Sequence, residues 1–358
     1  MSSPSKIPIL IASWVLLIPL SRGDIGPMPG TERVTPVFND ADLVCKCFVQ
    51  LLSTSEHSIK INGHDAIHRN VTATVVVQDR YKANGNDAKT IIVEYEEDVY
   101  RGHRVRGSHL RLQQGETALL FLKTETAKTY SFVDPFLGAT PISSLPQATG
   151  EPGLPKLESA LRHAALNGVR IDRLRALQLL QGFDVLDSET LSEVELFCNS
   201  DDEEIAFGAL GVLLKSRTPE SVERLRNTLD AYHSGEQPMA LVSIGRELAQ
   251  VNNYEALPNI ETLSASKYTA IQLGAMDSIR LMKNVHSIPT LIKRLDDANG
   301  TVQYVAVITL AEILGKFDGD YAPTMNLFDD KPLYYRELWK RWWTDDGRKL
   351  YAPPTSLN

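Results

Sequence analysis

Cysteine is scarce in this chain of 358 residues, which contains only Cys45, Cys47 and Cys198. So few cysteines exclude the disulfide-dense scaffolds found among small secreted domains, and an odd number leaves at least one thiol unpaired within a monomer. Cys45 and Cys47 lie two residues apart in a predicted strand, so their side chains share a face in directions poorly suited to bonding each other. We expect buried, free thiols.

Local signatures of catalysis are also missing. The sequence has no GxSxG, GxxxxGK[ST], HExxH or GxGxxG pattern, and such patterns are typical of serine hydrolases, nucleotide-binding enzymes, zinc proteases and dinucleotide-binding enzymes. The acidic residues Asp201 and Asp202 precede a predicted helix, where negative charge is favourable without any catalytic role. We therefore expect a protein that is not an enzyme and has no cofactor.

Long apolar runs are limited to one, at the N-terminus. Lys6 is followed by the almost wholly apolar residues 7–20 and then by the small residues Ser21 and Gly23. This layout is typical of a secretory signal peptide, and the run is short for a bilayer span. We expect a signal peptide at 1–23, cleavage after Gly23, and a secreted or periplasmic protein without a stable membrane span. A retained membrane anchor is the alternative.

Basic residues are outnumbered, with 37 lysines and arginines against 45 acidic residues and a formal charge of −8. Removal of Lys6 and Arg22 with the signal peptide takes the charge to −10. The densest basic segment is directly preceded by an equal number of acids, the two sets being Arg101, Arg104, Arg106 and Arg111, and Glu94, Glu96, Glu97 and Asp98. We expect cross-strand ion pairs there and no nucleic-acid partner.

From about residue 40 to 135 the hydropathy pattern has a period of two. Runs rich in β-branched and aromatic residues occur at 43–49, 71–77, 90–95, 117–122 and 129–133. Turn residues separate the runs, as at 84–87 and 114–116. Five such strands predict a small barrel or sandwich within residues 24–140. Residues 141–155 follow with four prolines, two glycines and no periodicity, which predicts a linker.

Past residue 155 the apolar residues recur with a helical period. Residues 288–295 and 302–313 each carry one apolar stripe, and the polar segment between them predicts a bend. The unit recurs at steps of 31 to 35 residues, with comparable first-helix positions at Leu157, Leu191, Val222, Leu257 and Ile288. Because one hairpin cannot cover its own apolar face, about five hairpins over 156–316 predict an α-solenoid. A non-repetitive helical domain is the alternative.

Aromatic residues gather near the C-terminus. Tyr335, Leu338, Trp339 and Trp342 fall on one face of a predicted helix. We interpret residues 317–358 as an aromatic capping helix and tail that cover the last repeat. The alternative is an exposed patch that binds a partner.

The helical half resembles HEAT repeats over roughly 155–315. The resemblance rests on the repeat spacing, on the small residues Ala275 and Ala306 in second helices, and on the proline after the first anchor in 257–258 and 288–289. The basic residue usual early in the second helix is replaced by Gln272 and Gln303. HEAT stacks imply protein binding along the concave face. The W-x-x-W-W tail is similar to that of secreted bacterial proteins of unassigned role.

The β half resembles the netrin-like OB-fold domain of tissue inhibitors of metalloproteinases, through "FNDADLVCKCFVQLL", "NVTATVVVQDRYKAN", "KTIIVEY" and "LQQGETALLFLK". Those inhibitors chelate their target's zinc through a cysteine at the mature N-terminus. Here Cys45 lies some twenty residues past the expected cleavage site and the family's other cysteines are missing. The resemblance therefore implies the fold, whereas the inhibitory mechanism does not carry over.

Histidine clusters in the β half, at His57, His64, His68, His103 and His109. The motif "GHDAIH" places two imidazoles on one face if it is helical, as a metal site requires. It lies between predicted strands, has Asp65 where a zinc protease needs glutamate, and has no evident third ligand. We expect a polar loop there and no metal.

These observations predict an all-β domain followed by an all-α domain, a five-stranded OB-like barrel and then an α-solenoid of HEAT-like helical hairpins. The expected function is that of an exported, non-catalytic scaffold that holds a protein or peptide partner on its concave face. Second helices line that face in such stacks, and the candidate contacts are Glu203, Gln237, Lys267, Gln272 and Gln303. Two alternatives are a protease-inhibitory or peptidase-associated protein acting through the β domain, and a metal-dependent enzyme using the histidines between His57 and His109.

Overall fold

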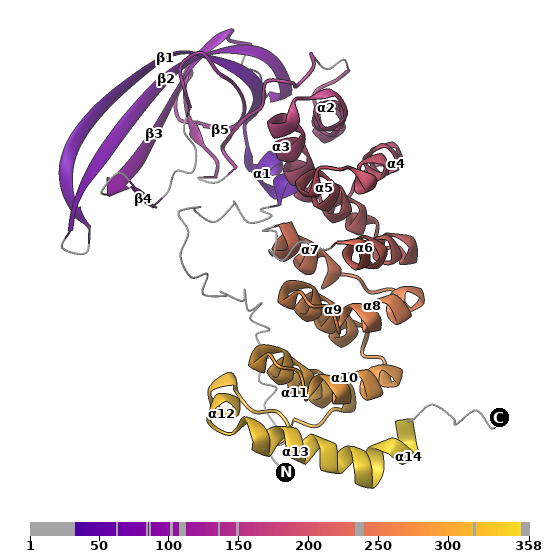
Figure 1. The fold of residues 1–358 in the computed structure, drawn as a ribbon. Helices are drawn as coiled ribbons and strands as arrows, with labels where there is room; N and C mark the ends of the chain where they lie inside the picture. Colours follow the sequence, from indigo (N-terminus) through magenta and orange to yellow (C-terminus); the bar gives the residue numbers. More distant parts are fainter. Residues whose placement is uncertain are drawn as a thin grey trace, which may run out of the picture.

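The structure, a computed structural model, describes residues 33–351 with short gaps. The gaps are residues 62–63, 84, 86, 101–102, 107–111, 135–136, 148–149, 233–239 and 318–319. The expected signal peptide at 1–23 therefore lies outside the described residues. Figure 1 shows strands gathered at one end of a long stack of helices, so a β half is followed by an α half, as the sequence predicts.

The described part of the β half contains seven strands. They are β1 (Leu43–Ile61), β2 (His64–Ala83), β3 (Thr90–Tyr100), β4 (His103–Arg106), β5 (Thr117–Thr124), β6 (Thr129–Phe132) and β7 (Ala139–Pro141). Neighbouring strands pair in the order β1–β2–β3–β6–β5, and an additional β1–β5 pairing closes these five into a ring. β4 pairs with β3 and β7 with β5. The five ring strands include the five predicted runs, which confirms those strand predictions.

Two ring strands extend well beyond the prediction. β1 has 19 residues and β2 has 20, and they stay paired as far as Ile61 and His64. A register shift between Val49 and Leu51 marks a β-bulge where β1 leaves the ring, and bulges often bend a strand at such a rim. The loop predicted for "GHDAIH" is therefore wrong, because the His64–His68 backbone belongs to β2. The polar composition of this motif gives no strand signal, because here the strand is held by backbone hydrogen bonds to β1 rather than by burial of its side chains.

A helix before the first strand is a second departure from the predicted β domain. α1 (Val34–Asp40) places Val34 and Phe38 in the core of the helical half. The backbone N–H of Val34 donates to the carbonyl of Gly182 at 2.6 Å. The first described residues of the β half are thus attached to the α half.

Five helix pairs follow in the described residues. The first helices are α2 (Leu154–Asn167), α4 (Ser188–Glu195), α6 (Pro219–Ala231), α8 (Leu257–Leu263) and α10 (Ile288–Arg294), and the second helices are α3 (Arg170–Gln181), α5 (Glu203–Leu213), α7 (Ala240–Leu248), α9 (Thr269–Met282) and α11 (Gly300–Leu314). Short 3₁₀ turns are η1 (Leu196–Asn199), η2 (Leu214–Ser216), η3 (Tyr254–Ala256) and η4 (Val285–Ser287). None of the described helices combines the length and the apolarity needed to cross a bilayer.

The 31-residue spacing reflects repeated local structure. Leu257 and Ile288 begin α8 and α10, each followed by a proline in the first turn, where a missing N–H costs no hydrogen bond. The preceding turns are capped alike, since the side chains of Asn253 and Asn284 each accept a hydrogen bond from the backbone N–H two residues later. The 31-residue spacing therefore arises because the same helix-start signal, an asparagine cap and a first-turn proline, recurs in these two helix pairs.

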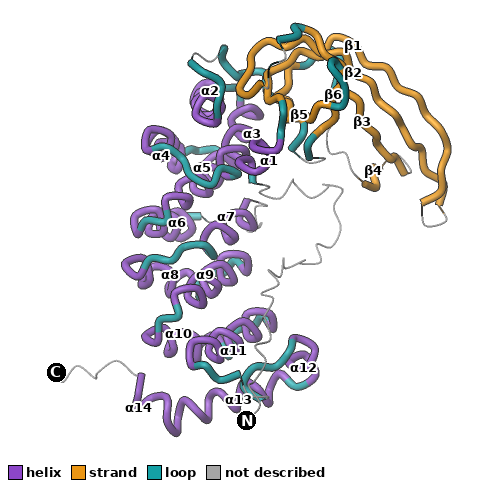
Figure 2. Tube along the Cα trace, turned by 180° about the vertical axis from the view of Figure 1, so that it is seen from behind, coloured by secondary structure: helices purple, strands orange, loops and turns teal. Residues whose placement is uncertain are grey.

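Successive pairs stack mainly through their second helices, and the tightest packing joins α7 to α9. Gly245 and Gly274 lie at this crossing, where a Cβ added to Gly274 would lie 2.2 Å from the carbonyl oxygen of Gly245. Ala270 lies equally close, because a Cβ on Gly245 would meet its carbonyl oxygen at 2.3 Å. The absence of side chains lets the two backbones touch. Figure 1 and Figure 2 show these second helices on the side of the stack toward which the β sheet extends.

Part of the β ring shares an apolar core with the first helix pair, whereas other ring residues form a buried cluster of their own. Leu119 and Phe121 of β5 and Leu157 and Leu161 of α2 belong to the same cluster of buried residues. This cluster continues along the stack to Trp339 near the C-terminus. The two halves are therefore joined by continuous packing.

Polar contacts reinforce this joint. The Pro-rich segment 141–155, predicted to be a linker, buries Ile142 and Leu145. Between those two residues, Ser143 and Ser144 each donate a backbone N–H and a hydroxyl to the buried carboxylate of Asp172 on α3, at 2.6 to 3.0 Å. This segment is packed in place along part of its length.

An ion pair adds a second contact across the joint. The ammonium of Lys156 on α2 lies 2.9 Å from the carboxylate of Asp79 on β2, and both side chains are largely buried. The same ammonium donates to the carbonyl of Arg80 at 2.9 Å. Because a buried charge needs several partners, this geometry fixes the angle at which α2 meets the sheet.

The C-terminal elements cover the last repeat. They are α12 (Met325–Asp330), α13 (Pro332–Trp342), the π-helical turn η5 (Trp343–Gly347) and α14 (Arg348–Tyr351). Trp339 is fully buried, and its indole N–H donates to the carbonyl of Tyr321 at 3.2 Å. Tyr335 is also buried, whereas Leu338 and Trp342 are half-buried. This burial favours the capping interpretation over an exposed aromatic patch.

A methyl group at the α7–α9 crossing tests the packing of the stack. We expect Gly274→Ala to lower the free energy of unfolding by about 1–3 kcal/mol or more, because overpacking forces backbones apart. Gly300→Ala is the matched control, since no atom lies within 4 Å of the added Cβ. Urea unfolding followed by circular dichroism measures both. Equal stabilities for the two variants would contradict the close crossing.

The joint is expected to be sensitive to acid through Asp172. Burial raises the pKa of this carboxyl, but the hydrogen bonds from Ser144 and Ser143 outweigh burial and leave the pKa below its usual value. A depressed folded-state pKa contributes stability above the unfolded-state pKa of about 3.9, and that contribution is lost as the pH falls through the folded-state pKa.

We therefore expect Asp172→Asn to lower the free energy of unfolding at pH 7 by about 1–2 kcal/mol, the typical effect of removing charge-assisted hydrogen bonds. The difference from the unsubstituted chain should shrink below about pH 4. Urea unfolding between pH 3 and 7 measures it, with the exposed Asp201→Asn as control. A pH-independent difference would rule out the carboxylate's role.

Candidate functional site

A groove opens between neighbouring first helices near the middle of the chain. It has a volume of about 820 Å³ and is lined by α4, η1, η2 and α6, and we call it the α4–α6 groove. α4 packs against α2, and α6 against α8, but α4 and α6 make at most minimal contact with each other. The groove lies in the first-helix layer, on the face of the stack away from the β sheet (Figure 1).

A 3₁₀ turn continues the shorter of the two helices. α4 has 8 residues and α6 has 13, so α4 spans about 12 Å and α6 about 20 Å. α4 ends at Glu195, where the chain tightens into the 3₁₀ turn η1. Cys198 and Asn199 of η1 line the groove together with Asn227, Thr228 and Ala231 in the second half of α6.

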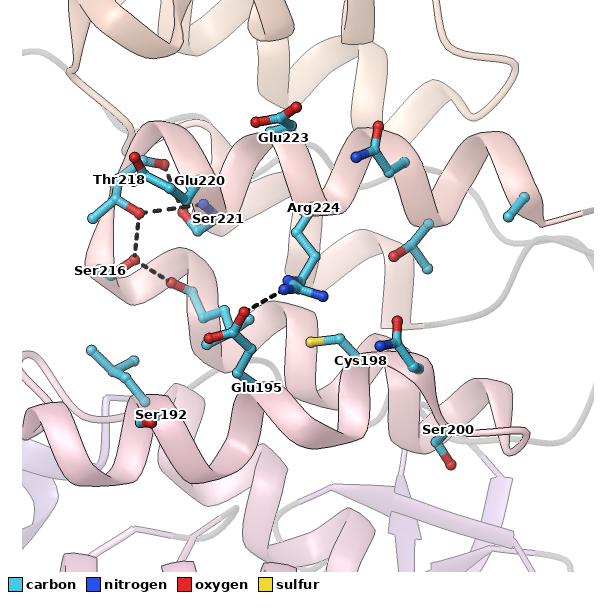
Figure 3. A pocket seen from close by; sticks show the side chains of 16 residues that line it. Ser192, Glu195, Cys198, Ser200, Ser216, Thr218, Glu220, Ser221, Glu223 and Arg224 are labelled. Carbon is cyan, nitrogen blue, oxygen red and sulfur yellow. Dashed lines mark hydrogen bonds and ion pairs between the residues drawn. The ribbon is translucent and has the colours of Figure 1, made fainter.

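An ion pair bridges the two walls. The guanidinium of Arg224 on α6 is hydrogen-bonded to the carboxylate of Glu195 on α4, as the dashed line in Figure 3 shows. Both side chains are partly exposed, so the pair contributes only about 0.2–1 kcal/mol to stability. Glu220 and Glu223 also line the groove. Three carboxylates against one guanidinium make its lining acidic.

The floor of the groove is apolar. Leu213 and Cys198 are buried there, and Leu191 lies on the α4 wall. Burial raises the pKa of Cys198 to about 12, so the thiol is protonated near neutral pH and is a poor nucleophile. Figure 3 shows its sulfur beside the Glu195–Arg224 bridge. Cys198 therefore acts as a small apolar contact surface.

Several polar side chains of the lining are available to a ligand. In the part of the chain that the structure describes, Ser192, Asn199 and Thr228 make no side-chain hydrogen bond, and Ser192 and Asn199 are exposed. By contrast, Ser221 is engaged within the α6 N-terminus, where its hydroxyl donates to the carbonyl of Thr218 at 2.8 Å. The groove thus offers hydrogen-bonding side chains above an apolar floor.

The five candidate contacts predicted from the sequence are not brought together here. Glu203 is exposed in the first turn of α5 and Lys267 is exposed just before α9, with its ammonium donating to the carbonyl of Tyr232 at 3.0 Å. Gln237 lies outside the described residues. None of the four described candidates lines the groove.

Two of the candidates have structural roles instead. Gln272 is buried, and its amide donates to the carboxylate of Asp297 at 3.0 Å. Gln303 donates to the backbone carbonyl of the same Asp297 at 2.5 Å. Both glutamines therefore fix the turn between α10 and α11. Because Gln272 is buried, it does not serve as a surface contact in this structure. The helical periodicity alone did not reveal this burial.

The histidine cluster is only partly described. The rings of His57 on β1 and His68 on β2 are cross-strand neighbours with centroids 4.8 Å apart. The backbones of His64 and His103 lie in β2 and β4, and His109 lies outside the described residues. Among the described residues no three histidine, cysteine or acidic side chains could hold a metal ion together.

The three cysteines are free and buried in the structure, which confirms the prediction made for them. The sulfur atoms of Cys45 and Cys47 lie 3.1 Å apart. Burial, more than the hydrogen bond with Cys45, holds the pKa of Cys47 well above its usual value. Both are core groups of the β ring, where they belong to its apolar cluster.

Comparison with known proteins adds no family assignment, since no family profile matches the sequence and no curated protein is significantly similar to it. Of the groove residues, sequence reasoning named Leu191 as a first-helix anchor and Cys198 as a buried thiol, and linked neither to a site. The anchors at Leu191 and Val222 did place a first helix on each side. The end of α4 at Glu195 was not predicted, because no capping residue or proline in the sequence marks it.

Proposed function

We propose that this protein is a non-catalytic scaffold that binds an extended segment of a partner protein in the α4–α6 groove. The observation that supports this proposal is the groove itself, an opening of about 820 Å³ in the first-helix layer of a packed stack. Its walls are helices held by the shared core. Binding to a preformed site loses less conformational entropy than binding to a site that must first order.

The lining favours a basic side chain in the bound segment. The stem of a lysine or arginine would cover Leu191, Leu213 and Cys198, because such side chains place their methylene groups on apolar surface. Its charged head would then lie near Glu220 and Glu223, which line the groove. Charge-assisted hydrogen bonds of this kind are stronger than neutral ones. The bound segment is therefore a basic peptide in this proposal.

The proposal keeps the wider expectations from the sequence. The apolar run at 7–20 after Lys6 supports an exported protein. The helix pairs, with their 31-residue spacing and the proline at the start of α8 and α10, support HEAT-type repeats. The closed ring of five strands supports an OB-like fold for the β half. The groove lies in the first-helix layer, whereas HEAT stacks lead one to expect a site on the concave face, which second helices line.

Filling the groove tests the proposed function. Selection of a random-peptide library on the purified chain should enrich basic peptides, and Ser192→Trp should weaken their binding at least tenfold because the indole occupies the groove. Ser188→Trp is the matched control, since Ser188 is exposed on the same helix and does not line the groove. Fluorescence anisotropy measures both affinities.

Two results would refute the proposal. One is a selection that enriches no peptide. The other is a set of enriched peptides that bind Ser192→Trp and Ser188→Trp equally well, since the binding site would then lie elsewhere. Enrichment of acidic peptides would contradict the assigned charge preference.

A further inference from the structure

The extension of β1 beyond the ring carries an open strand edge. As far as Phe48, β1 pairs with β2 on one side and β5 on the other, and Val49 still exchanges backbone hydrogen bonds with Gly115 and Glu116. From Leu51 to Ile59, β1 pairs with β2 alone among the described residues, and Gln50 before this stretch is the bulged residue, with no partner in the β2 register. These nine residues span about 31 Å at 3.4 Å per residue. Their outward N–H and C=O groups form one continuous row.

This edge faces away from the rest of the protein. Figure 1 and Figure 2, taken from opposite sides, both show β1 on the outer contour of the sheet, with β3 on the side toward the helix stack. The residues from Ser53 to Ser58 are all exposed. A second strand can therefore approach the edge without meeting the helices.

The usual devices that protect a strand edge are few along this stretch. Natural edges are blunted by proline, by unpaired charge, by bulges or by a covering segment. The stretch from Leu51 to Ile59 contains no proline, and the bulge at Gln50 and the charged Lys60 lie just outside it. Its only acidic side chain, Glu56, is paired with Arg69 on β2 at 2.5 Å. An edge of this length and neutrality can template a further strand.

The sequence of the edge is self-complementary in antiparallel pairing. With Ser55 of two chains opposite each other, Leu51 of each chain faces Ile59 of the other, and Glu56 faces Thr54. No two like charges then oppose each other, and the two apolar pairs cover Leu51, whose side chain is otherwise 53% exposed. A twofold axis through Ser55 generates this arrangement, because it brings the same edge antiparallel to itself.

We propose that two copies of this chain associate through the β1 edge from Leu51 to Ile59, paired antiparallel about Ser55 to form one sheet across the dimer. An antiparallel ladder of this length supplies about ten backbone hydrogen bonds. A second copy of the chain fits this edge, since the edge matches itself in length, in charge and in its apolar pairs. The α4–α6 groove lies on the helix stack and stays open in such a dimer.

Sedimentation velocity of the purified chain from about 1 to 100 μM tests the proposal. We expect a species of twice the chain mass. Leu51→Lys with Ile59→Lys should convert it to monomer and weaken association at least a hundredfold, because each lysine then faces a lysine of the other copy. The control is Leu281→Lys with Leu333→Lys, which makes the same change at exposed leucines of the helical half.

Cysteine scanning tests the pairing itself and does not depend on the double variant folding well. Under mild oxidation Ser55→Cys should form a covalent dimer, because residues directly opposite have Cβ atoms about 5 Å apart. Ser53→Cys should not, since two such cysteines would lie four residues apart along the ladder. The native cysteines are buried.

Three outcomes would overturn the proposal. One is a monomer at every concentration. Another is a dimer that the lysines at 51 and 59 do not disrupt, or that the control lysines disrupt equally. The third is equal cross-linking through positions 53 and 55, which excludes pairing about Ser55.

Discussion

The fold depends on an apolar core that crosses the boundary between strands and helices, beside a second core that lies within the β ring. Phe121 of β5 and Leu157 of α2 are buried in the same cluster, which continues to Trp339 in the C-terminal cap. A helix pair cannot cover its own apolar face and takes its cover from its neighbours. Here the β ring covers the first pair and α13 covers the last. The Lys156–Asp79 ion pair and the serine hydrogen bonds to Asp172 fix the orientation of the ring relative to α2 and α3.

The two surfaces with the clearest binding potential are both places where this regular packing is interrupted. α4 is followed at Glu195 by the 3₁₀ turn η1, and the α4–α6 groove lies between these two elements and α6. β1 leaves the ring at the bulge near Gln50, and from Leu51 to Ile59 no described strand pairs with its outer edge. Both places are held by packed helices or paired strands. Each exposes hydrogen-bonding groups whose counterparts in neighbouring repeats or strands are bonded within the protein. The groove offers side chains to a ligand, whereas the edge offers backbone.

Much of the fold could be predicted because its signals are periodic. Leu257 and Ile288 recur at 31 residues because each begins a helix after an asparagine-capped turn, and the five ring strands coincide with apolar runs between turn residues. The ends of helices and strands were harder to predict from the sequence. The distal part of β1 and β2 is polar because it has little core to cover, so alternation gives no sign of it. Gln272 looks like a surface residue until Asp297 of the next pair is placed beside it. Such tertiary contacts cannot be predicted from the local hydropathy pattern of the sequence.

Hydrogen exchange read by mass spectrometry at increasing denaturant tests the shared core most directly. If the ring and the first helix pair are one cooperative unit, peptides covering 117–124 and 157–165 should lose protection at the same denaturant concentration and with the same slope. Earlier loss of protection in 117–124, with 157–165 still protected, would show that the ring opens by itself and would contradict the account.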